Sequence, residues 1–121
     1  MTLFISKSGL QTCSDGGNHV IRKISPEGEV STYAGAGIAG HADGPASSAR
    51  FNSPINLCFD TEGNLYVSDF QNQRIRKITP AGEVSTIAGD GFVGYEDGPA
   101  LQARFSYPRG ICIDDQGNLC I

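Results

Sequence analysis

The sequence predicts an all-β protein built from repeats, and three observations lead to this prediction. First, the stretch that begins at Ser14-Asp15 recurs from Ser68-Asp69, so the chain repeats every 54 residues without a gap, with about half of the positions identical. Second, short runs of strand-like residues are separated by turn residues too closely for helices. Third, the 121 residues include 16 glycines and 6 prolines, which is typical of turn-rich β structure.

The composition argues against nonspecific nucleic-acid binding and against a membrane protein. Charged residues make up 18% of the chain, the formal net charge is −4 and the pI is near 4.9. Nonspecific nucleic-acid binding needs clustered Lys and Arg, so this acidity argues against a general role in following phosphate backbones. The first apolar run is too short for a signal peptide, and no later run approaches a membrane helix. We therefore expect no membrane segment and favour a cytoplasmic location.

The cysteines predict free thiols. Cys58 and Cys112 occupy equivalent positions of the two copies, inside the apolar runs LCF and ICI, while Cys13 and Cys120 lie elsewhere. We interpret the equivalent pair as buried small hydrophobic residues in a reducing compartment, with disulfide pairing as the less favoured alternative. No CxxC pair marks a metal site.

Each repeat contains four runs of strand-like residues. In the second copy they are Ile55 to Asp60, Asn64 to Asp69, Arg74 to Thr79 and Glu83 to Ala88. Three-residue turns separate the first two runs and the last two, which is short enough for hairpins. Four antiparallel strands joined by tight turns and followed by a longer Gly-rich link are what one blade of a β-propeller needs.

The stretch from Pro54 to Ile78 resembles the NHL repeat, a family of propeller blades. The resemblance rests on Leu-Cys-Phe-Asp, Gly-Asn-Leu-Tyr-Val-Ser-Asp and an Asn before Arg-Ile-Arg-Lys-Ile, in that order. The link from Asp90 to Phe105 also resembles the inter-blade segment of many NHL proteins, so the resemblance covers nearly the whole chain. It implies β-propeller blades that mediate protein interactions. In some members it implies RNA binding, and in one enzyme group a metal-dependent lyase reaction.

On this reading, residues 1–121 form one propeller segment. Residues 1–50 are interpreted as a partial first blade with its link, 51–104 as a complete second blade with its link, and 105–121 as the start of a third. About four to eight blades close a propeller, and two blades leave edge strands that invite pairing with another chain. We therefore predict a fragment of a larger propeller; the alternative is a head-to-tail ring, in which about three copies give six blades.

The first blade allows two registers. Matching Leu3-Phe4-Ile5-Ser6 to Leu65-Tyr66-Val67-Ser68 makes residues 7–14 an insertion, and we favour this register because LFIS alternates as a strand does. The competing register aligns Ser14 with Ser68 and makes Leu10 to Cys13 a degraded strand.

Residues that the two copies share are interpreted as structural. We expect Asp15 and Asp69 to accept backbone hydrogen bonds from the turn that follows. Arg22 and Arg76, like Arg50 and Arg104, are expected to be inter-blade ion-pair partners or solvated strand residues.

Positions at which the copies differ are the candidates for binding. The turns between the second and third strands should emerge at the same edge of the blades as the links. That edge is predicted to carry residue types in which binding energy concentrates. The binding candidates are Phe70, Gln71, Tyr95, Tyr107 and Arg109. Packing of the aromatic residues within the loops is the alternative interpretation.

No catalytic motif is present in the sequence. The segment Gly35 to Gly40 fits GxGxxG, but it lies between strands, whereas a nucleotide fingerprint opens a helix. We therefore expect a non-catalytic module that binds a protein partner through the face bearing the links, with no cofactor and no metal. An RNA-binding alternative requires five basic residues to gather locally: Arg74, Arg76, Lys77, Arg104 and Arg109. A lyase alternative requires a tightly bound zinc ion.

Overall fold

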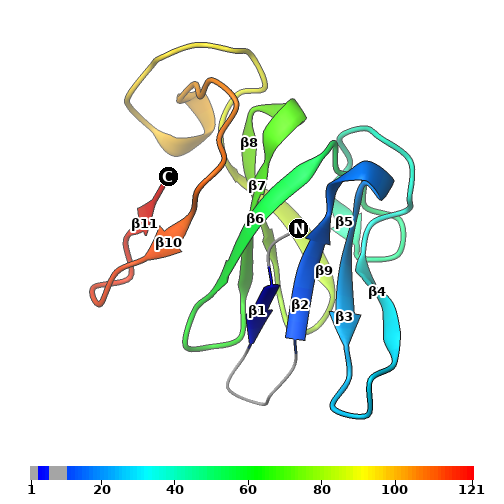
Figure 1. Cartoon of the computed structure of the whole chain (residues 1–121). Helices are drawn as coiled ribbons and strands as arrows, with labels where there is room; N and C mark the ends of the chain where they lie inside the picture. The colour runs from blue at the N-terminus through cyan, green and yellow to red at the C-terminus, as the bar shows by residue number, and fades with distance from the viewer. Residues whose placement is uncertain (1–2, 6–10) are drawn as a thin grey trace.

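The computed structural model describes residues 3–5 and 11–121, and these residues form antiparallel sheets (Figure 1). One sheet has the strand order β1-β2-β3-β4, a second has the order β5-β9-β8-β7-β6, and β10 pairs with β11. The strands of the first blade are β1 Leu3–Ile5, β2 Gln11–Asp15, β3 Val20–Ile24 and β4 Val30–Ala34. Those of the second blade are β6 Pro54–Phe59, β7 Leu65–Asp69, β8 Arg74–Ile78 and β9 Glu83–Ala88. The remaining strands are β5 Gly44–Pro45, β10 Cys112–Ile113 and β11 Leu119–Cys120.

The second blade confirms the predicted order of four strands, each of which ends within a residue or two of its predicted bounds. Its first hairpin is closed by Asp60, whose Oδ1 accepts hydrogen bonds from the backbone N–H groups of Glu62 and Asn64, both at 2.9 Å. Gly63 supplies the positive φ of 88° that this turn requires. A short 3-10 turn follows the second strand of each blade: η1, Gly16–Asn18, and η2, Phe70–Asn72.

The first blade corrects the predicted register. Ser14 is the Cα partner of Ile21, as Ser68 is of Ile75, so Ser14 and Ser68 are equivalent. The interpretation of residues 7–14 as an insertion is therefore wrong where the structure describes them, and residues 7–10 lie outside the described residues. The alternation of LFI did not discriminate between registers, because a first strand alternates in the same way. With β1 in place, the described first blade has four strands rather than a part of them.

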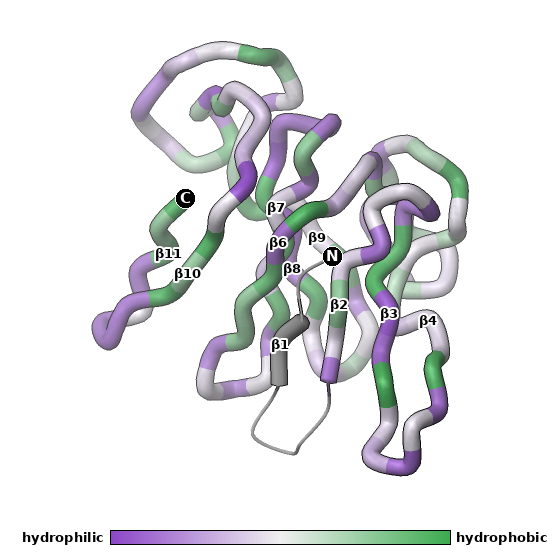
Figure 2. Tube along the Cα trace, viewed as in Figure 1, coloured by the Kyte–Doolittle hydropathy of each residue, from purple (hydrophilic) through white to green (hydrophobic). Residues whose placement is uncertain are grey.

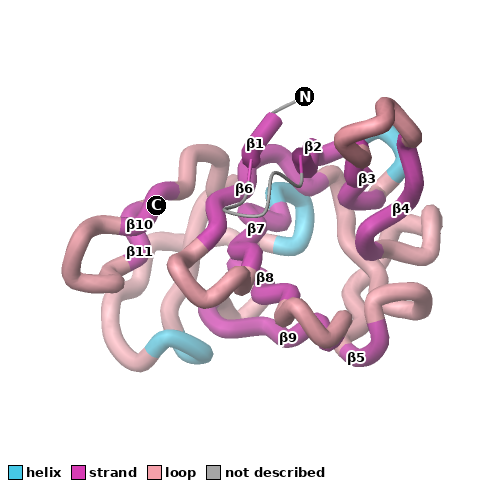
Figure 3. Tube along the Cα trace, turned by 90° about the horizontal axis from the view of Figure 1, so that it is seen from below, coloured by secondary structure: helices cyan, strands magenta, loops and turns pink. Residues whose placement is uncertain are grey.

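Two long links connect the blades, and we define the first link as residues 36–51 and the second link as residues 90–105. The first link contains β5, which pairs with β9 at the outer edge of the second blade, as the view from below shows (Figure 3). The second link contains the 3-10 turn η3, Ala100–Gln102. Each link is closed by an antiparallel bridge at equivalent positions, Ala42 with Arg50 and Glu96 with Arg104.

The main core lies between the two blades and beneath the first link. Its buried members are Ile21, Ala34, Ala49, Phe51, Leu57, Leu65, Val67, Ile78 and Val84. A second cluster of Cys58, Ile75 and Ile111 lies between the second blade and the segment that leads to β10. Figure 2 shows hydrophobic stretches within the strands and a hydrophilic tip on the β10–β11 hairpin. The buried apolar side chains therefore hold neighbouring blades together and do not form a separate core within each blade. In the described part of the chain, no helix is long and apolar enough to cross a membrane.

Candidate binding face at the inter-blade turns

The turns after β2 and β7 lie at the same edge as the segments that enter the next blade, as the sequence predicts. The backbone N–H of Gln71 in η2 donates to the carbonyl of Asn52 at 3.0 Å. The side chain of Asn72 donates to the carbonyl of Gly40 in the first link at 2.7 Å. We call this edge the turn face, and it is formed by η1, η2 and the residues between each link and the following strand.

A repeated clasp holds each turn to the blade that follows. Nδ1 of His19 accepts a hydrogen bond of 3.1 Å from the backbone N–H of Ser53, and Oε1 of Gln73 accepts one of 2.6 Å from the backbone N–H of Tyr107. All four residues have left-handed backbone conformations, with φ between 54° and 59°. Such conformations are uncommon outside glycine and persist where the surroundings fix them. Sequence reasoning treated His19 and Gln73 only as variable positions; the signal it missed is that both side chains can accept a hydrogen bond.

Four of the five predicted binding residues lie on the turn face, and three of them pack together there. The rings of Phe70 and Tyr107 lie with centroids 5.1 Å apart at an interplanar angle of 46°. The Cζ atom of Arg109 lies 5.1 Å from the centroid of the Phe70 ring, within the range of a cation–π contact. Tyr107 keeps 42% of its surface exposed, and Arg109 is also exposed. We call Phe70, Tyr107 and Arg109 the aromatic cluster.

The other two candidates are placed differently. Gln71 is exposed and its backbone ties η2 to Asn52, while Tyr95 projects from the second link with 91% of its surface exposed. The first-link residue equivalent to Tyr95 is His41, whose Nε2 lies 2.8 Å from the hydroxyl of Thr86 on β9. Tyr95 therefore occupies a position that contacts the outer strand of the next blade.

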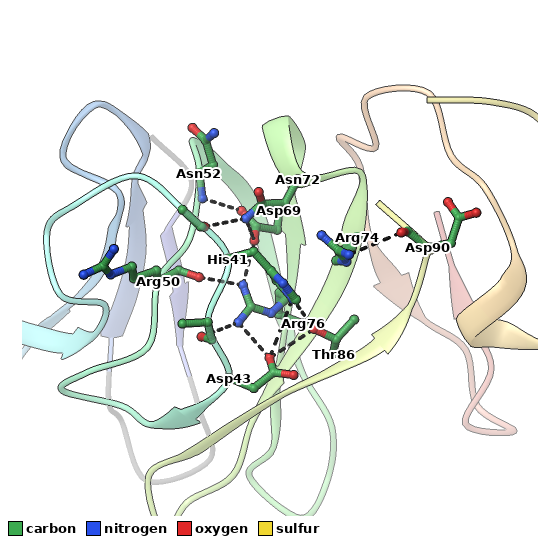
Figure 4. A network of polar contacts seen from close by, with 12 residues as sticks. His41, Asp43, Arg50, Asn52, Asp69, Asn72, Arg74, Arg76, Thr86 and Asp90 are labelled. Carbon is green, nitrogen blue, oxygen red and sulfur yellow. Dashed lines mark hydrogen bonds and ion pairs between the residues drawn. The ribbon is translucent and has the colours of Figure 1, made fainter. Parts of the chain in front are cut away.

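The shared residues Asp69 and Arg76 form a buried network rather than a surface site (Figure 4). The guanidinium of Arg76 has no exposed side-chain surface and donates to the Asp69 carboxylate at 2.8 Å. It also donates to the carboxylate of Asp43 at 2.9 Å and to the carbonyls of Ala42 and Arg50, both at 2.8 Å. Its Cζ lies 4.8 Å from the centroid of the Phe51 ring. Arg76 thus binds the first link to the second blade.

Asp69 differs from its predicted role. It accepts hydrogen bonds from the side chain of Asn72 at 2.7 Å and from the backbone N–H of Asn52 at 2.8 Å, not from the backbone of the turn that follows. The segment between the first link and β6 comes close enough for Asn52 to supply the backbone donor in place of the turn. Burial raises the pKa of the Asp69 carboxyl, and the hydrogen bonds from Asn72 and Asn52 and the charge of Arg76 oppose that rise. Burial, followed by the charges of Arg76 and Arg74, lowers the pKa of His41.

The five basic residues required by the RNA alternative do not form one exposed cluster. Arg76 is fully buried, and Arg104 donates to the carboxylate of Asp90 at 2.7 Å. Arg74 donates to the carbonyl of Asp90 at 3.2 Å, and Arg109 lies on the turn face. Lys77 lines a cavity of about 570 Å³ between the second blade and the β10–β11 hairpin.

That cavity has acidic walls. It is lined by Phe59, Asp60, Thr61, Glu62, Asn64, Tyr66, Lys77, Ile113, Asp114, Asp115 and Gly117. The carboxylate of Asp60 accepts a hydrogen bond of 3.0 Å from the Tyr66 hydroxyl. Burial and this bond raise the pKa of Tyr66 to about 12. In the described residues, no group of three or more His, Cys, Asp or Glu side chains is placed to hold a metal ion.

The cysteines are free in the described residues, but one predicted position is wrong. Cys58 is buried, as expected, whereas its counterpart Cys112 is exposed. Cys58 packs with Ile111 of the segment that leads to β10, and in the described structure no following segment covers Cys112 in the same way. Cys112 and Cys120 are Cα partners across the β10–β11 hairpin.

Comparisons with known proteins agree with this architecture. Residues 51–78 match the NHL repeat family model. Human NHL repeat-containing protein 2 is 37% identical over 82 residues, which cover 67% of this chain and 11% of that protein. A structural genomics protein of unknown function from Bacteroides thetaiotaomicron superposes with a TM-score of 0.90 at 33% identity, covering 97% of this chain and 30% of its own. An auxiliary nutrient binding protein from the same organism gives 0.83 at 27% identity, covering 94% and 32%. The chain spans about a tenth of the length of the curated relatives it matches.

Proposed function

This chain belongs to the NHL-repeat proteins and is built from β-propeller blades, and on that premise we propose that it is a non-catalytic module that binds a protein partner through the turn face. The observation that carries the proposal is the aromatic cluster. An exposed Arg over an aromatic ring, beside a second aromatic ring, combines the residue types that contribute most to protein interfaces.

The repeat itself supports a role for the aromatic cluster beyond folding. At the equivalent positions of the preceding junction the chain has Gly16, Ser53 and Ile55. Ser53 and Tyr107 share the same φ of 54°, so the junction adopts this backbone without an aromatic side chain. The large side chains of the cluster are therefore not needed to form the turn, and they leave a surface that a partner can bury.

One further observation favours protein binding over the RNA alternative. The basic residues that an RNA site would need are dispersed, buried or paired with Asp90. Aromatic and Arg side chains are enriched in protein interfaces, so the aromatic cluster favours a protein as the partner.

The test exchanges one junction for the other. The replacements Phe70→Gly, Tyr107→Ser and Arg109→Ile reproduce the residues of the first junction. A photo-cross-linking amino acid at position 107 of the otherwise native chain first identifies the partner, which is then purified. Isothermal titration calorimetry measures its dissociation constant for the native chain and for the triple variant. We expect binding at least about tenfold weaker in the variant.

Tyr95→Ser is the matched control, because it removes an exposed aromatic residue from outside the aromatic cluster. We expect this variant to bind the partner with native affinity. Circular dichroism establishes that each variant is folded. Native affinity in the triple variant, together with a loss in Tyr95→Ser, would overturn the assignment to the turn face.

A further inference from the structure

The second link adopts the conformation of the first link although, among the described residues, no outer strand lies beneath it. In both links the residue that opens the link, Gly35 or Gly89, donates from its backbone N–H to an Ala carbonyl, at 2.8 Å and 2.9 Å. The bridge bond to the carbonyl of residue 42 or 96 measures 3.0 Å in both. Gly44 and Gly98 have φ values of 124° and 135°. The second link is therefore formed before anything docks on it.

The first link shows what such a link holds. Gly44 pairs with Val84 on β9, and the backbone N–H of Ala46 donates to the carbonyl of Gly82 at 2.8 Å. The carboxylate of Asp43 forms an ion pair with the guanidinium of Arg76, and His41 contacts Thr86. The first link thus clasps the outer edge of the second blade, and the buried Arg76 fills its centre.

The corresponding groups of the second link are exposed. Asp97 is the equivalent of Asp43, and within the described part of the chain it has no ion-pair partner. Four of the eight exposed large hydrophobic residues of the described chain lie on this link. They are Phe92 at 67%, Val93 at 53%, Tyr95 at 91% and Leu101 at 60%. This surface combines an acidic centre with an apolar rim.

The edge that matches the second link is β4, on the first blade of the same chain. Val30 on β4 is 53% exposed, whereas Val84, one repeat later and covered by β5, is 2% exposed. Arg22 has a single hydrogen-bonding acceptor in the described structure, Asp15 at 3.3 Å, and its side chain is 33% exposed, whereas Arg76 is fully buried with four acceptors. The first blade therefore presents a cation and an unpaired strand edge of the kind that a link covers.

We propose that the second link of one copy docks on β4 of another copy, with Arg22 of the receiving copy bound by Asp97 and by the carbonyls of Glu96 and Arg104. Gly98 and Pro99 then lie along Val30, as Gly44 and Pro45 lie along Val84. Donor and receiver surfaces differ, so the contact is head to tail and leaves one free surface of each kind until a ring closes. The acidic link and the basic edge are complementary in charge.

Docking also exchanges a hairpin. Residues 109–121 follow residues 1–13 by two full repeats, so the β10–β11 hairpin takes the place of β1 and the start of β2 in the receiving copy. Its turn is closed by Asp114, which accepts hydrogen bonds from Asn118 at 2.8 Å and 2.9 Å. The sequence of the receiving copy has Ser6 and Leu10 at these positions, and a Leu side chain has no amide to donate. The incoming hairpin is the better match to the blade, and about three copies close six blades.

The test is the mass of the whole chain in solution, measured by light scattering after size-exclusion chromatography over a wide range of concentrations. The native chain is expected to associate to a trimer. Asp97→Arg and Arg22→Glu each place like charges across the contact, so each variant alone is expected to be monomeric. The double variant, with Asp97→Arg and Arg22→Glu in one chain, restores an opposite-charge pair at every contact of the ring and is expected to form the trimer again.

Each outcome decides the proposal. Asp97 lies on an exposed link outside the core, so Asp97→Arg tests docking without disturbing a blade, and circular dichroism checks its fold. Recovery in the double variant distinguishes a specific contact from general loss of solubility. A native chain that stays monomeric at every concentration overturns the proposal and assigns the second link to a following repeat of a longer chain. Association that survives Asp97→Arg unchanged also overturns it.

Discussion

Oε1 of Gln73 accepts a hydrogen bond of 2.6 Å from the backbone N–H of Tyr107, 34 residues further along the chain. His19 makes the same bond to Ser53 one repeat earlier, at 3.1 Å. A Gln amide oxygen and a His ring nitrogen thus serve one purpose, which is to satisfy an amide held in a left-handed conformation at the entrance of the next blade.

Replacing Gln73 should show whether its hydrogen bond to Tyr107 stabilises the fold or whether position 73 varies between the repeats without consequence. Gln73→Ala leaves the Tyr107 N–H without its acceptor in a partly buried position, and we expect a loss of about 1–3 kcal/mol in the free energy of unfolding. Gln73→His restores an acceptor that the first repeat already uses, so it should lose much less. Urea unfolding followed by circular dichroism measures both. Equal losses in the two variants would show that the side chain only fills space.

The two equivalent arginines offer a second matched pair. Arg76→Ala leaves the buried Asp69 carboxylate without its counter-ion, and breaking a buried pair in this way costs about 3–5 kcal/mol. Arg22→Ala removes a half-exposed pair, for which we expect about 0–1 kcal/mol. The comparison is made by urea unfolding at neutral pH under conditions in which the native chain is monomeric. A loss for Arg22→Ala as large as that for Arg76→Ala contradicts the structure.

The two equivalent valines should respond differently to truncation. Val84 is buried in the main core, and Val84→Ala removes buried apolar surface, for which we expect a loss of about 1–2 kcal/mol. Val30→Ala at an exposed edge should change the free energy of unfolding by less than about 0.5 kcal/mol in the monomer. Thermal unfolding at low protein concentration gives both values. A large loss in the Val30→Ala monomer would mean that β4 is covered within one chain.

Acid should weaken the first hairpin of the second blade. Desolvation alone would raise the pKa of Asp60, but hydrogen bonds from Asn64, Glu62 and Tyr66 outweigh it, so the pKa lies below its ordinary value. A carboxylate with a lowered folded pKa contributes stability above its unfolded pKa and loses it as the pH falls through the folded value. Between about pH 5 and pH 2, the free energy of unfolding of Asp60→Asn should therefore fall less steeply than that of the native chain. Parallel slopes would refute this role for Asp60.

Cys58 and Cys112 provide a chemical readout of burial. Burial raises the pKa of the Cys58 thiol to about 11, with smaller contributions from Cys112 and Asp60, so little thiolate forms at pH 8. Cys112 is exposed. Iodoacetamide at pH 8 should alkylate Cys112 well before Cys58, and peptide mapping by mass spectrometry follows both sites. Equal rates in the folded chain would show that Cys58 is accessible.

The sequence predicted the second blade closely because its strands carry the period-two pattern and its turns carry Gly and Asp at fixed places. It did not predict β5, since Gly44 and Pro45 have no strand propensity and pair only because the link lies against β9. The register of the first blade was predicted wrongly because every strand of a blade has the same alternation of residues. Alternation therefore cannot show whether a segment forms the first or the second strand. The gapless period of 54 residues, extended back to Leu3, would have identified it.

The candidate site was predicted only in part. Residue type placed Phe70, Tyr107 and Arg109 among the binding candidates, and topology placed them at one edge. Their gathering depends on the clasp between Gln73 and Tyr107, a contact over 34 residues that no local pattern encodes. Tyr95 looked similar in sequence, but its repeat equivalent His41 assigns it to the edge that meets the next blade.

The clasp of the first link on the second blade bears on how a chain of this kind can gain or lose 54-residue units. The acidic clamp and the arginine that fills it lie in consecutive 54-residue units, so duplicating or deleting any window of that length leaves one clamp for every arginine inside the chain. A crossover between the two copies therefore alters the number of blades without producing a mismatched junction. A rearrangement of this chain by whole 54-residue steps would therefore yield a product whose internal contacts are already compatible.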